Sequence, residues 1–258
     1  MNSKISQAIG TRYSPVAILF GAEKPAAAIQ FQEGRWGCIV SMLNAAAKGR
    51  TAVFDRKTHG CIGGGAGLGF GNTYLDFPGG IEYFLSKGNP AFCESEAGKN
   101  IVRNMPALRH GEAYKKNPAF AKSFADALPY YDVSAEYIIF KSLAELLPEE
   151  KPEVIVFLCT PDQISAMVTL ANYGRDGGDN VIVPWGAGCH TIGIIPLNEG
   201  KSDNPRGVIG LTDITVRKQL DKDILSFSVP YKMFLEMESN VDESFLTRES
   251  WLDLKQRN

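Results

Sequence analysis

The sequence lacks both a long apolar segment and an excess of charge of either sign. No uninterrupted apolar run approaches the roughly 20 residues that a membrane-spanning helix needs. The chain of 258 residues carries 27 lysines and arginines against 29 aspartates and glutamates, a formal net charge of −2. Because no basic excess attracts a phosphate backbone or an anionic lipid surface, we expect neither a nucleic acid nor a membrane as a partner.

The chain also lacks a secretory signal and is poor in cysteine. Its first twenty residues show no basic stretch followed by an apolar core and a small-residue cleavage site. Five cysteines are an odd number, which excludes complete pairing in disulfides within the chain. We therefore expect a cytoplasmic protein whose cysteines are free thiols that pack in the core, bind metal or act as nucleophiles.

Apolar runs alternate with helical segments along a chain of average globular composition. An apolar share of 44% with 22% charged residues excludes a disordered chain. The pattern predicts strands at about 16–20, 51–54, 137–140, 154–158, 181–183 and 224–229. It predicts helices at about 38–48 and 163–173, one that begins at 230 and one near 247. This order indicates an α/β fold, with α+β as the alternative.

Two segments of the chain share the same order of features. Each contains a proline, an apolar strand, a helix with alanines, a glycine, a short strand, a turn and a Gly-Cys pair. Cys61 lies eight positions after Val53, and Cys189 lies eight positions after Val181. Any two βαβ units give a similar pattern, so the shared Gly-Cys pair is the informative part.

The repeat leads to a prediction of domain organisation. We expect one compact domain over residues 1–258, with a mixed sheet built from two related βαβ-like halves, at about 13–75 and 150–197, and helices outside. Prolines and glycines interrupt helical pieces at about 79–127, which we interpret as a helical insertion. The sequence leaves open whether the C-terminal helix packs on the same chain or on a second copy in a homo-oligomer.

The segment 60–71, GCIGGGAGLGFG, holds seven glycines in twelve positions and predicts a glycine-rich loop. It matches neither the dinucleotide pattern G-x-G-x-x-G nor a phosphate loop, since no lysine lies between Lys57 and Lys87. Dense glycine lets backbone N–H groups approach a ligand, and it equally lets two backbone segments pack closely. The candidate ligand-binding glycines are Gly60, Gly63, Gly64, Gly65 and Gly67.

Three cysteines stand where a metal ligand or a reactive thiol is expected. Cys38 begins a predicted helix, where the helix dipole favours a thiolate, Cys61 begins the glycine-rich segment, and Cys189 follows Gly188. No C-x-x-C pair occurs, so only the fold can bring them together, and simple burial is the alternative. The candidate ligands for zinc or an iron–sulfur cluster are Cys38, Cys61, Cys189, His59 and His190.

The chain resembles the domain of unknown function 169 (DUF169) family of bacteria and archaea over about residues 15–231. The resemblance rests on the proline and valine before the first strand, Cys38 at the Ala-rich helix, Cys61 with its glycines, the segment Thr160-Pro161-Asp162-Gln163, and Gly188-Cys189. It implies no established reaction, but it implies that relatives carry cysteine at these three positions.

One departure from the family bears on the number of ligands. Relatives have a cysteine before the arginine that matches Arg217, where this chain has Thr212-Asp213. If that cysteine is a fourth ligand in the relatives, the resemblance implies that this chain has a site of three thiolates with an open position or an oxygen ligand. A protein that binds a metal or an iron–sulfur cofactor is the favoured hypothesis, because both repeats end in Gly-Cys. The alternatives are a module that binds a small anionic metabolite and a thiol-nucleophile enzyme with His59 or His190 as the base.

Overall fold

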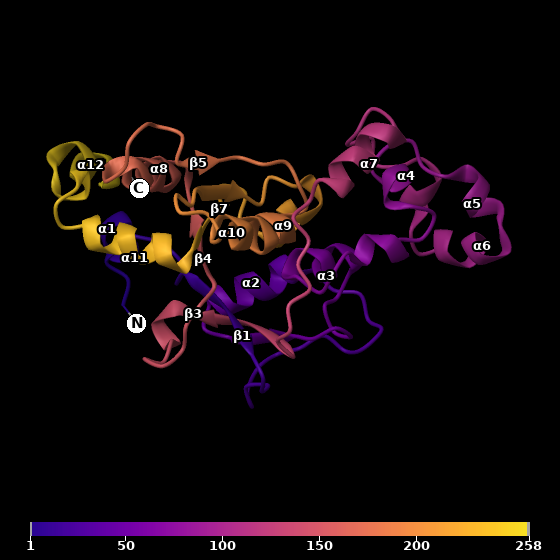
Figure 1. Cartoon of the computed structure of the whole chain (residues 1–258), viewed down its shortest axis with the longest axis horizontal. Coiled ribbons are helices and arrows are strands. Elements are labelled where there is room, and N and C mark those ends of the chain that lie inside the picture. The colour runs from indigo at the N-terminus through magenta and orange to yellow at the C-terminus, as the bar shows by residue number, and fades with distance from the viewer. Residues whose placement is uncertain (1, 257–258) are drawn as a thin grey trace.

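Seven strands form one sheet in the order β2-β3-β1-β4-β7-β6-β5 in the computed structural model, which describes residues 2–256 (Figure 1). Strands β5 and β6 pair in parallel, and the remaining neighbours pair antiparallel. The prediction of an α/β fold with a mixed sheet is thus confirmed. The strands are β1 (Val16–Gly21), β2 (Ala52–Phe54), β3 (Tyr137–Ser142), β4 (Val154–Cys159), β5 (Val181–Ile182), β6 (Gly207–Gly210) and β7 (Leu225–Pro230).

The two central strands, β1 and β4, begin the two segments that share a sequence pattern. They pair antiparallel, with Ala17 opposite Ile155. Strand β1 is followed by α2 (Ile39–Ala47), β2 and α3 (Ile62–Leu68), and β4 is followed by α8 (Pro161–Tyr173), β5 and α9 (Gly188–Ile192). Strand β3 lies between β1 and β2, and β7 and β6 lie between β4 and β5. Each half therefore contains two parallel strands that are not neighbours, and the common origin of the halves stays a prediction.

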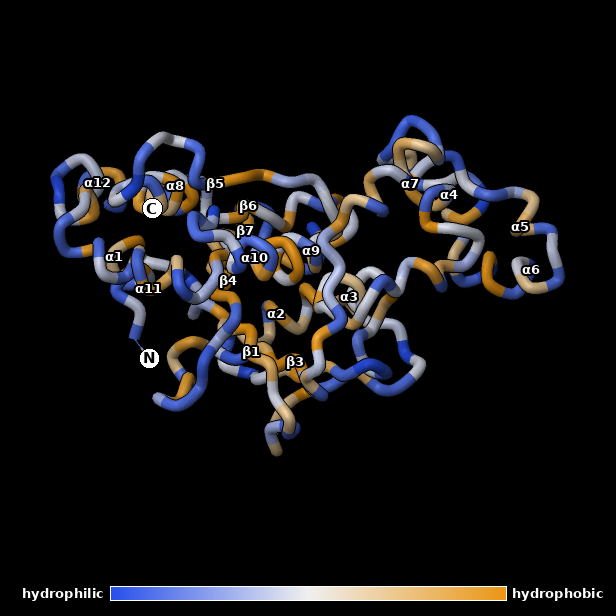
Figure 2. The backbone as a smooth tube through the Cα atoms, in the orientation of Figure 1, coloured by the Kyte–Doolittle hydropathy of each residue, from blue (hydrophilic) through white to orange (hydrophobic). Residues whose placement is uncertain are grey.

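Helices cover both faces of the sheet, so the central strands are apolar on both sides. In β1, Ala17 and Leu19 belong to one buried cluster, and Val16 and Ile18 belong to the other. The first cluster is covered by α1 (Lys4–Ile9), α8, α11 (Tyr231–Asn240) and α12 (Glu249–Lys255), and the second by α2, α9 and α10 (Ile194–Glu199). Burial on both faces explains why these strands read as continuous apolar runs, and Figure 2 shows hydrophobic residues gathered there.

The C-terminal helix packs on its own chain. Trp251 of α12 is buried, and its indole Nε1 donates a hydrogen bond to the Ala8 carbonyl of α1 at 3.1 Å. The Lys255 ammonium donates to the carbonyls of Gln7 and Ala8. These contacts place α12 on its own chain, and a homo-oligomer stays a prediction. None of the helices between residues 2 and 256 has the length and apolar character to cross a membrane.

Short helices between α3 and β3 form a separate group that extends from one end of the sheet (Figure 1). We call residues 73–126 the helical lobe; they include most of the segment at 79–127 for which we predict a helical insertion. Asparagine or serine side chains cap three of its helices at their N-termini, with proline next in two of them. The lobe contains η1 (Thr73–Asp76), α4 (Ile81–Phe84), α5 (Pro90–Glu94), α6 (Glu96–Val102), η2 (Pro106–Arg109) and α7 (Pro118–Asp126).

The predicted glycine-rich loop is instead helix α3, and close packing is the reason for its glycines. A Cβ at Gly64 would lie 2.5 Å from the His59 carbonyl oxygen, and one at Gly67 would lie 2.6 Å from the backbone of Cys189. A Cβ at Gly193 would lie 2.0 Å from the Gly67 carbonyl oxygen. Helices α3 and α9, which begin at the two Gly-Cys pairs, thus cross at backbone contact, and this contact outweighs the low helix propensity of glycine.

Candidate functional site

A cavity of about 590 Å³ lies between the sheet and the helical lobe. The sheet side contributes the beginnings of α2, α3 and α9 and the short helix η4 (Ile214–Gln219), and the lobe contributes residues from η1, α4 and α7. This volume lies within the range of roughly 300–1,000 Å³ that is usual for small-molecule sites. The cavity is therefore the candidate binding site of the molecule.

Most of the cavity wall is apolar and aromatic. The sheet side supplies Trp36, Ile39 and Trp185, and the rings of Trp185 and Phe124 lie 4.5 Å apart between centroids. The Lys115 ammonium lies 4.4 Å from the Trp185 centroid, a cation–π contact that also joins the two parts. The apolar side chains from the lobe are Phe77, Ile81, Phe84, Leu85, Met105 and Phe124.

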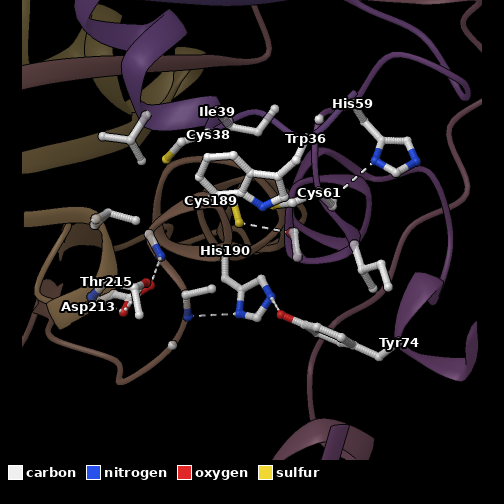
Figure 3. A pocket seen from close by; sticks show the side chains of 18 of the residues that line it. Trp36, Cys38, Ile39, His59, Cys61, Tyr74, Cys189, His190, Asp213 and Thr215 are labelled. Atoms are coloured by element: carbon white, nitrogen blue, oxygen red, sulfur yellow. Dashed lines mark hydrogen bonds between the residues drawn. The ribbon is translucent and has the colours of Figure 1, made fainter. Parts of the chain in front are cut away.

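The fold brings Cys38, Cys61 and Cys189 to this one cavity, where Figure 3 shows them around the indole of Trp36. Cys38 is the N-cap of α2, Cys61 is the N-cap of α3, and Cys189 lies in the first turn of α9. All five cysteines are free, and the other two are buried and do not line the cavity. Three separate elements therefore supply the thiols.

Two of the three thiols are held neutral by burial. The Cys189 thiol donates to the Gly63 carbonyl oxygen at 2.8 Å, and the Cys61 sulfur accepts from the Gly64 N–H at 3.2 Å. Burial raises the pKa of Cys61 above its ordinary value and that of Cys189 well above it, and the nearby Cys38 and Asp213 side chains add to both shifts. Both groups are therefore thiols rather than thiolates at neutral pH.

The five predicted metal ligands, Cys38, Cys61, Cys189, His59 and His190, are not grouped around a single metal ion among residues 2–256, and their binding of a cofactor stays a prediction. No three His, Cys, Asp or Glu side chains between residues 2 and 256 are placed to hold one ion. The His59 Nδ1 lies 2.9 Å from the Cys61 carbonyl oxygen, and both ring nitrogens of His190 are engaged in hydrogen bonds. The histidines thus have other partners, and what remains of the predicted set is the group of three thiols.

The five candidate glycines divide into two groups. Gly60 and Gly63 line the cavity, whereas Gly64, Gly65 and Gly67 do not. A Cβ at Gly65 would lie 2.8 Å from the Thr73 side chain, and the other two face His59 and Cys189. The packing interpretation holds for these three glycines and also for Gly60, where a Cβ would lie 2.6 Å from the Gly37 carbonyl oxygen. Contact with a ligand stays a prediction for the two that line the cavity, Gly60 and Gly63.

A pair that the sequence did not reveal, Tyr74 and His190, forms one end of the cavity (Figure 3). The Tyr74 Oη lies 3.0 Å from the His190 Nε2, and the Ala187 N–H donates to the His190 Nδ1 at 3.2 Å. Burial lowers the pKa of His190 to about 4, so its ring is neutral at pH 7. Tyr74 lies far from His190 in sequence and in no recognisable motif, so no local signal could have identified the pair.

Positive charge predominates at the solvent-facing edge of the cavity. Arg35, Lys57 and Lys218 line it and are exposed. Lys57 lies 3.6 Å from an exposed glutamate. The acid in the lining, Asp213, accepts hydrogen bonds from the Gly188 and Thr215 N–H groups and from the Thr215 hydroxyl. An anionic group at this edge would therefore meet cations rather than a free carboxylate.

The arrangement offers little to nucleophilic catalysis by Cys61 or Cys189 with His190 as the base. A nucleophilic thiol needs a lowered pKa, and those of Cys61 and Cys189 are raised. A general base works best with a pKa near the working pH, whereas that of His190 is about 4. The geometry therefore favours binding over thiol chemistry for these three residues.

Comparison with known proteins gives a family but no characterised relative. The model of the DUF169 family, described as uncharacterised ArCR, matches residues 4–240. No curated protein and no solved structure matches the chain significantly.

Proposed function

This chain belongs to the DUF169 family, and because that family is uncharacterised, we propose a function from the cavity itself. The protein binds a small molecule with an apolar, ring-containing body and an anionic group, held between the sheet and the helical lobe. The observation that carries this proposal is the aromatic cavity of about 590 Å³ with three cations at its edge. The five free thiols fit the reducing cytoplasm that we predict from the sequence.

The apolar wall supplies the affinity in this proposal. Removal of apolar surface from water contributes about 25 cal/mol for each Å² buried. Six apolar side chains of the lobe line the cavity together with Trp36, Ile39 and Trp185 of the sheet side. A ligand of two or three fused rings buries most of its surface on such walls, as small-molecule sites usually require.

The charged edge supplies selectivity for an anion. Arg35 and Lys218 form no ion pair among residues 2–256, so both are available to a ligand. Both are exposed, where a single ion pair contributes about 0–1 kcal/mol. We therefore expect the anionic group to tune affinity severalfold and the rings to determine whether binding occurs at all.

Two dyes that differ by one sulfonate test the proposal. N-phenyl-1-naphthylamine and 8-anilino-1-naphthalenesulfonate share their rings, and both fluoresce strongly in apolar sites. We expect both to bind the folded protein with one site per chain. In low salt, Arg35→Gln with Lys218→Gln should weaken the sulfonate about three- to tenfold and leave the neutral dye unchanged.

The control is Lys151→Gln, which removes an exposed positive charge that does not line the cavity. It should leave both affinities at their original values. The proposal is abandoned if neither dye binds stoichiometrically to the folded chain. If Lys151→Gln weakens binding of the sulfonate as much as the double variant at Arg35 and Lys218 does, the anionic part of the proposal fails and the apolar part stands.

A second candidate function, binding of an iron–sulfur cluster, is favoured by the three thiols in one cavity. Zinc–sulfur bonds of about 2.3 Å require the sulfurs of a single ion to lie within about 4 Å of one another. No three ligands meet that need between residues 2 and 256. A cluster of several irons holds its thiolates farther apart, so it suits Cys38, Cys61 and Cys189 better than zinc does.

Anaerobic purification followed by iron, sulfide and zinc analysis and a visible absorption spectrum tests this candidate. A cluster protein should be coloured and should lose its iron when Cys38, Cys61 or Cys189 is changed to serine. Cys93→Ala is the matched control, because Cys93 is buried away from the cavity. A colourless protein without iron or zinc under these conditions removes the candidate.

A further inference from the structure

The hydrogen-bond partners of His190 determine which of its nitrogens carries the proton. The Ala187 backbone N–H points at Nδ1, so Nδ1 accepts and is not protonated. The neutral ring then carries its proton on Nε2, which donates to the Tyr74 Oη at 3.0 Å. His190 is 1% exposed, so water does not compete for either nitrogen.

This arrangement leaves the hydrogen of the Tyr74 hydroxyl without an acceptor. The phenol oxygen receives the His190 proton, and His190 is the hydrogen-bond partner that the hydroxyl has among residues 2–256. Burial raises the pKa of Tyr74 well above its ordinary value, so the phenol keeps its hydrogen. Tyr74 is part-buried and lines the cavity, so a ligand atom can accept the hydrogen that no protein group among residues 2–256 accepts.

The surroundings favour a neutral acceptor over a carboxylate at this end of the cavity. The groups whose charges act on the Tyr74 hydroxyl are Cys189, Cys61, Tyr130 and Asp213, which are negative or neutral. A Cβ at Gly63 would lie 3.2 Å from the Tyr74 Oη and 3.9 Å from the Cys189 sulfur, so the absence of a side chain at Gly63 leaves space beside the hydroxyl. A buried anion here would meet no cation, whereas the exposed cations lie at the solvent-facing edge.

We infer that the ligand of this cavity places a neutral carbonyl oxygen beside Gly63, where it accepts a hydrogen bond from the Tyr74 hydroxyl. His190 is a positioning residue, which holds the phenol oxygen so that its hydrogen faces the cavity. The inference rests on the proposed function and specifies the ligand further: an apolar ring system with a carbonyl at its buried end and an anionic group at the solvent-facing edge.

Two probes that differ only by a carbonyl test the inference. 9-Fluorenone carries the acceptor and fluorene lacks it, and equilibrium dialysis measures the affinity of each. Tyr74→Phe keeps the ring and removes the donor, so it should weaken fluorenone about three- to tenfold and leave fluorene unchanged. The infrared carbonyl stretch of bound fluorenone should move to lower frequency in the original protein and return to its unbonded position in Tyr74→Phe.

A second variant keeps the inference testable if Tyr74→Phe fails to fold. Gly63→Ala keeps Tyr74 and His190 but fills the space beside the hydroxyl, so it should also abolish the carbonyl shift while fluorene still binds. If both probes bind and the carbonyl stretch is the same in all three proteins, the inference is wrong and the proposed function stands. If neither probe nor either naphthalene dye binds, the proposed function fails, and the inference fails with it.

Discussion

At the scale of single residues, His190 makes the stability of the protein depend on pH. Its pKa is about 4 in the folded chain and about 6.5 when unfolded, so the unfolded state binds more protons between these values. The stabilisation is complete above pH 6.5 and is lost progressively as the pH falls toward 4. The shift corresponds to a loss of about 3 kcal/mol once the pH has fallen below 4.

Urea unfolding at pH 7 and pH 4.5 checks this dependence. The original protein should lose a large part of that 3 kcal/mol between the two values. His190→Gln should be less stable at pH 7 and should lose less on acidification, because it has no group to protonate there. Equal losses in both proteins would show that carboxylates, and not His190, govern the acid response.

Among the residues, sequence reasoning found the cysteines but not their tyrosine neighbour. The Gly-Cys offset singled out Cys61 and Cys189, because equivalent positions of two similar units can be compared along the chain. Tyr74 belongs to the lobe and meets His190 only through the packing of the lobe on the sheet. Such a contact depends on the whole fold, and no local pattern encodes it.

At the scale of secondary-structure elements, the crossing of α3 and α9 fixes the floor of the cavity. Gly67→Ala would place a methyl group 2.6 Å from the backbone of Cys189, which cannot move without moving α9. We expect a loss of about 1–3 kcal/mol in the free energy of unfolding, the usual result of overpacking. Urea denaturation of the purified variant measures it.

Gly63→Ala is the matched comparison in the same helix. Its methyl group would meet the end of the Tyr74 side chain at 3.2 Å and the Cys189 sulfur at 3.9 Å, and no backbone atom comes as close; alanine also has the higher helix propensity. We expect a change of less than about 1 kcal/mol in either direction. Equal destabilisation by both variants would mean that the contact between α3 and α9 is not the reason for Gly67.

Secondary-structure elements with a recognisable sequence pattern were predicted from the sequence. Elements that depend on contacts with distant parts of the chain were not. The segment Thr160-Pro161-Asp162-Gln163 encodes the start of α8, because Thr160 and Gln163 form a capping box and Pro161 occupies the first turn. Strand β6 has four residues, with glycine at both ends, and α9 has five residues. Both are too short for the periodicity of apolar residues to indicate a strand or a helix. The glycines of α3 led to the prediction of a loop, because glycine has a low helix propensity. That propensity carries no information about the packing of α9, which requires the glycines.

At the scale of the whole molecule, the sequence indicated the fold class but not the order of the strands. Apolar runs predicted six of the seven strands. The central pairing of β1 with β4 joins segments more than a hundred residues apart, and such long-range pairing has no local signature. The cavity could not be predicted for the same reason, since one wall belongs to the sheet and the other to the lobe.

Trp185 connects the two parts and offers a test of how they are held. Its ring contacts Phe124, and Lys115 lies over it. We expect Trp185→Ala to increase amide hydrogen exchange across residues 73–126 while β1 and β4 stay protected. Leu252→Ala, at an exposed position on α12, is the control and should leave exchange in the lobe unchanged. Equal exchange in the lobe of Trp185→Ala and of the original protein would show that other contacts hold it.

Because the cavity lies between the sheet and the helical lobe, the proposed ligand would also affect how firmly the lobe is held. A ligand in the cavity would contact both the sheet side and the helical lobe. Its free energy of binding would therefore also stabilise the packing of the lobe on the sheet. The lobe carries α5 and α6 at its outer end, away from the sheet (Figure 1). Binding of a ligand in the cavity would therefore reduce the motion of α5 and α6, although neither helix lies next to the sheet. A partner that contacts the outer end of the lobe could then distinguish the ligand-bound protein from the free protein.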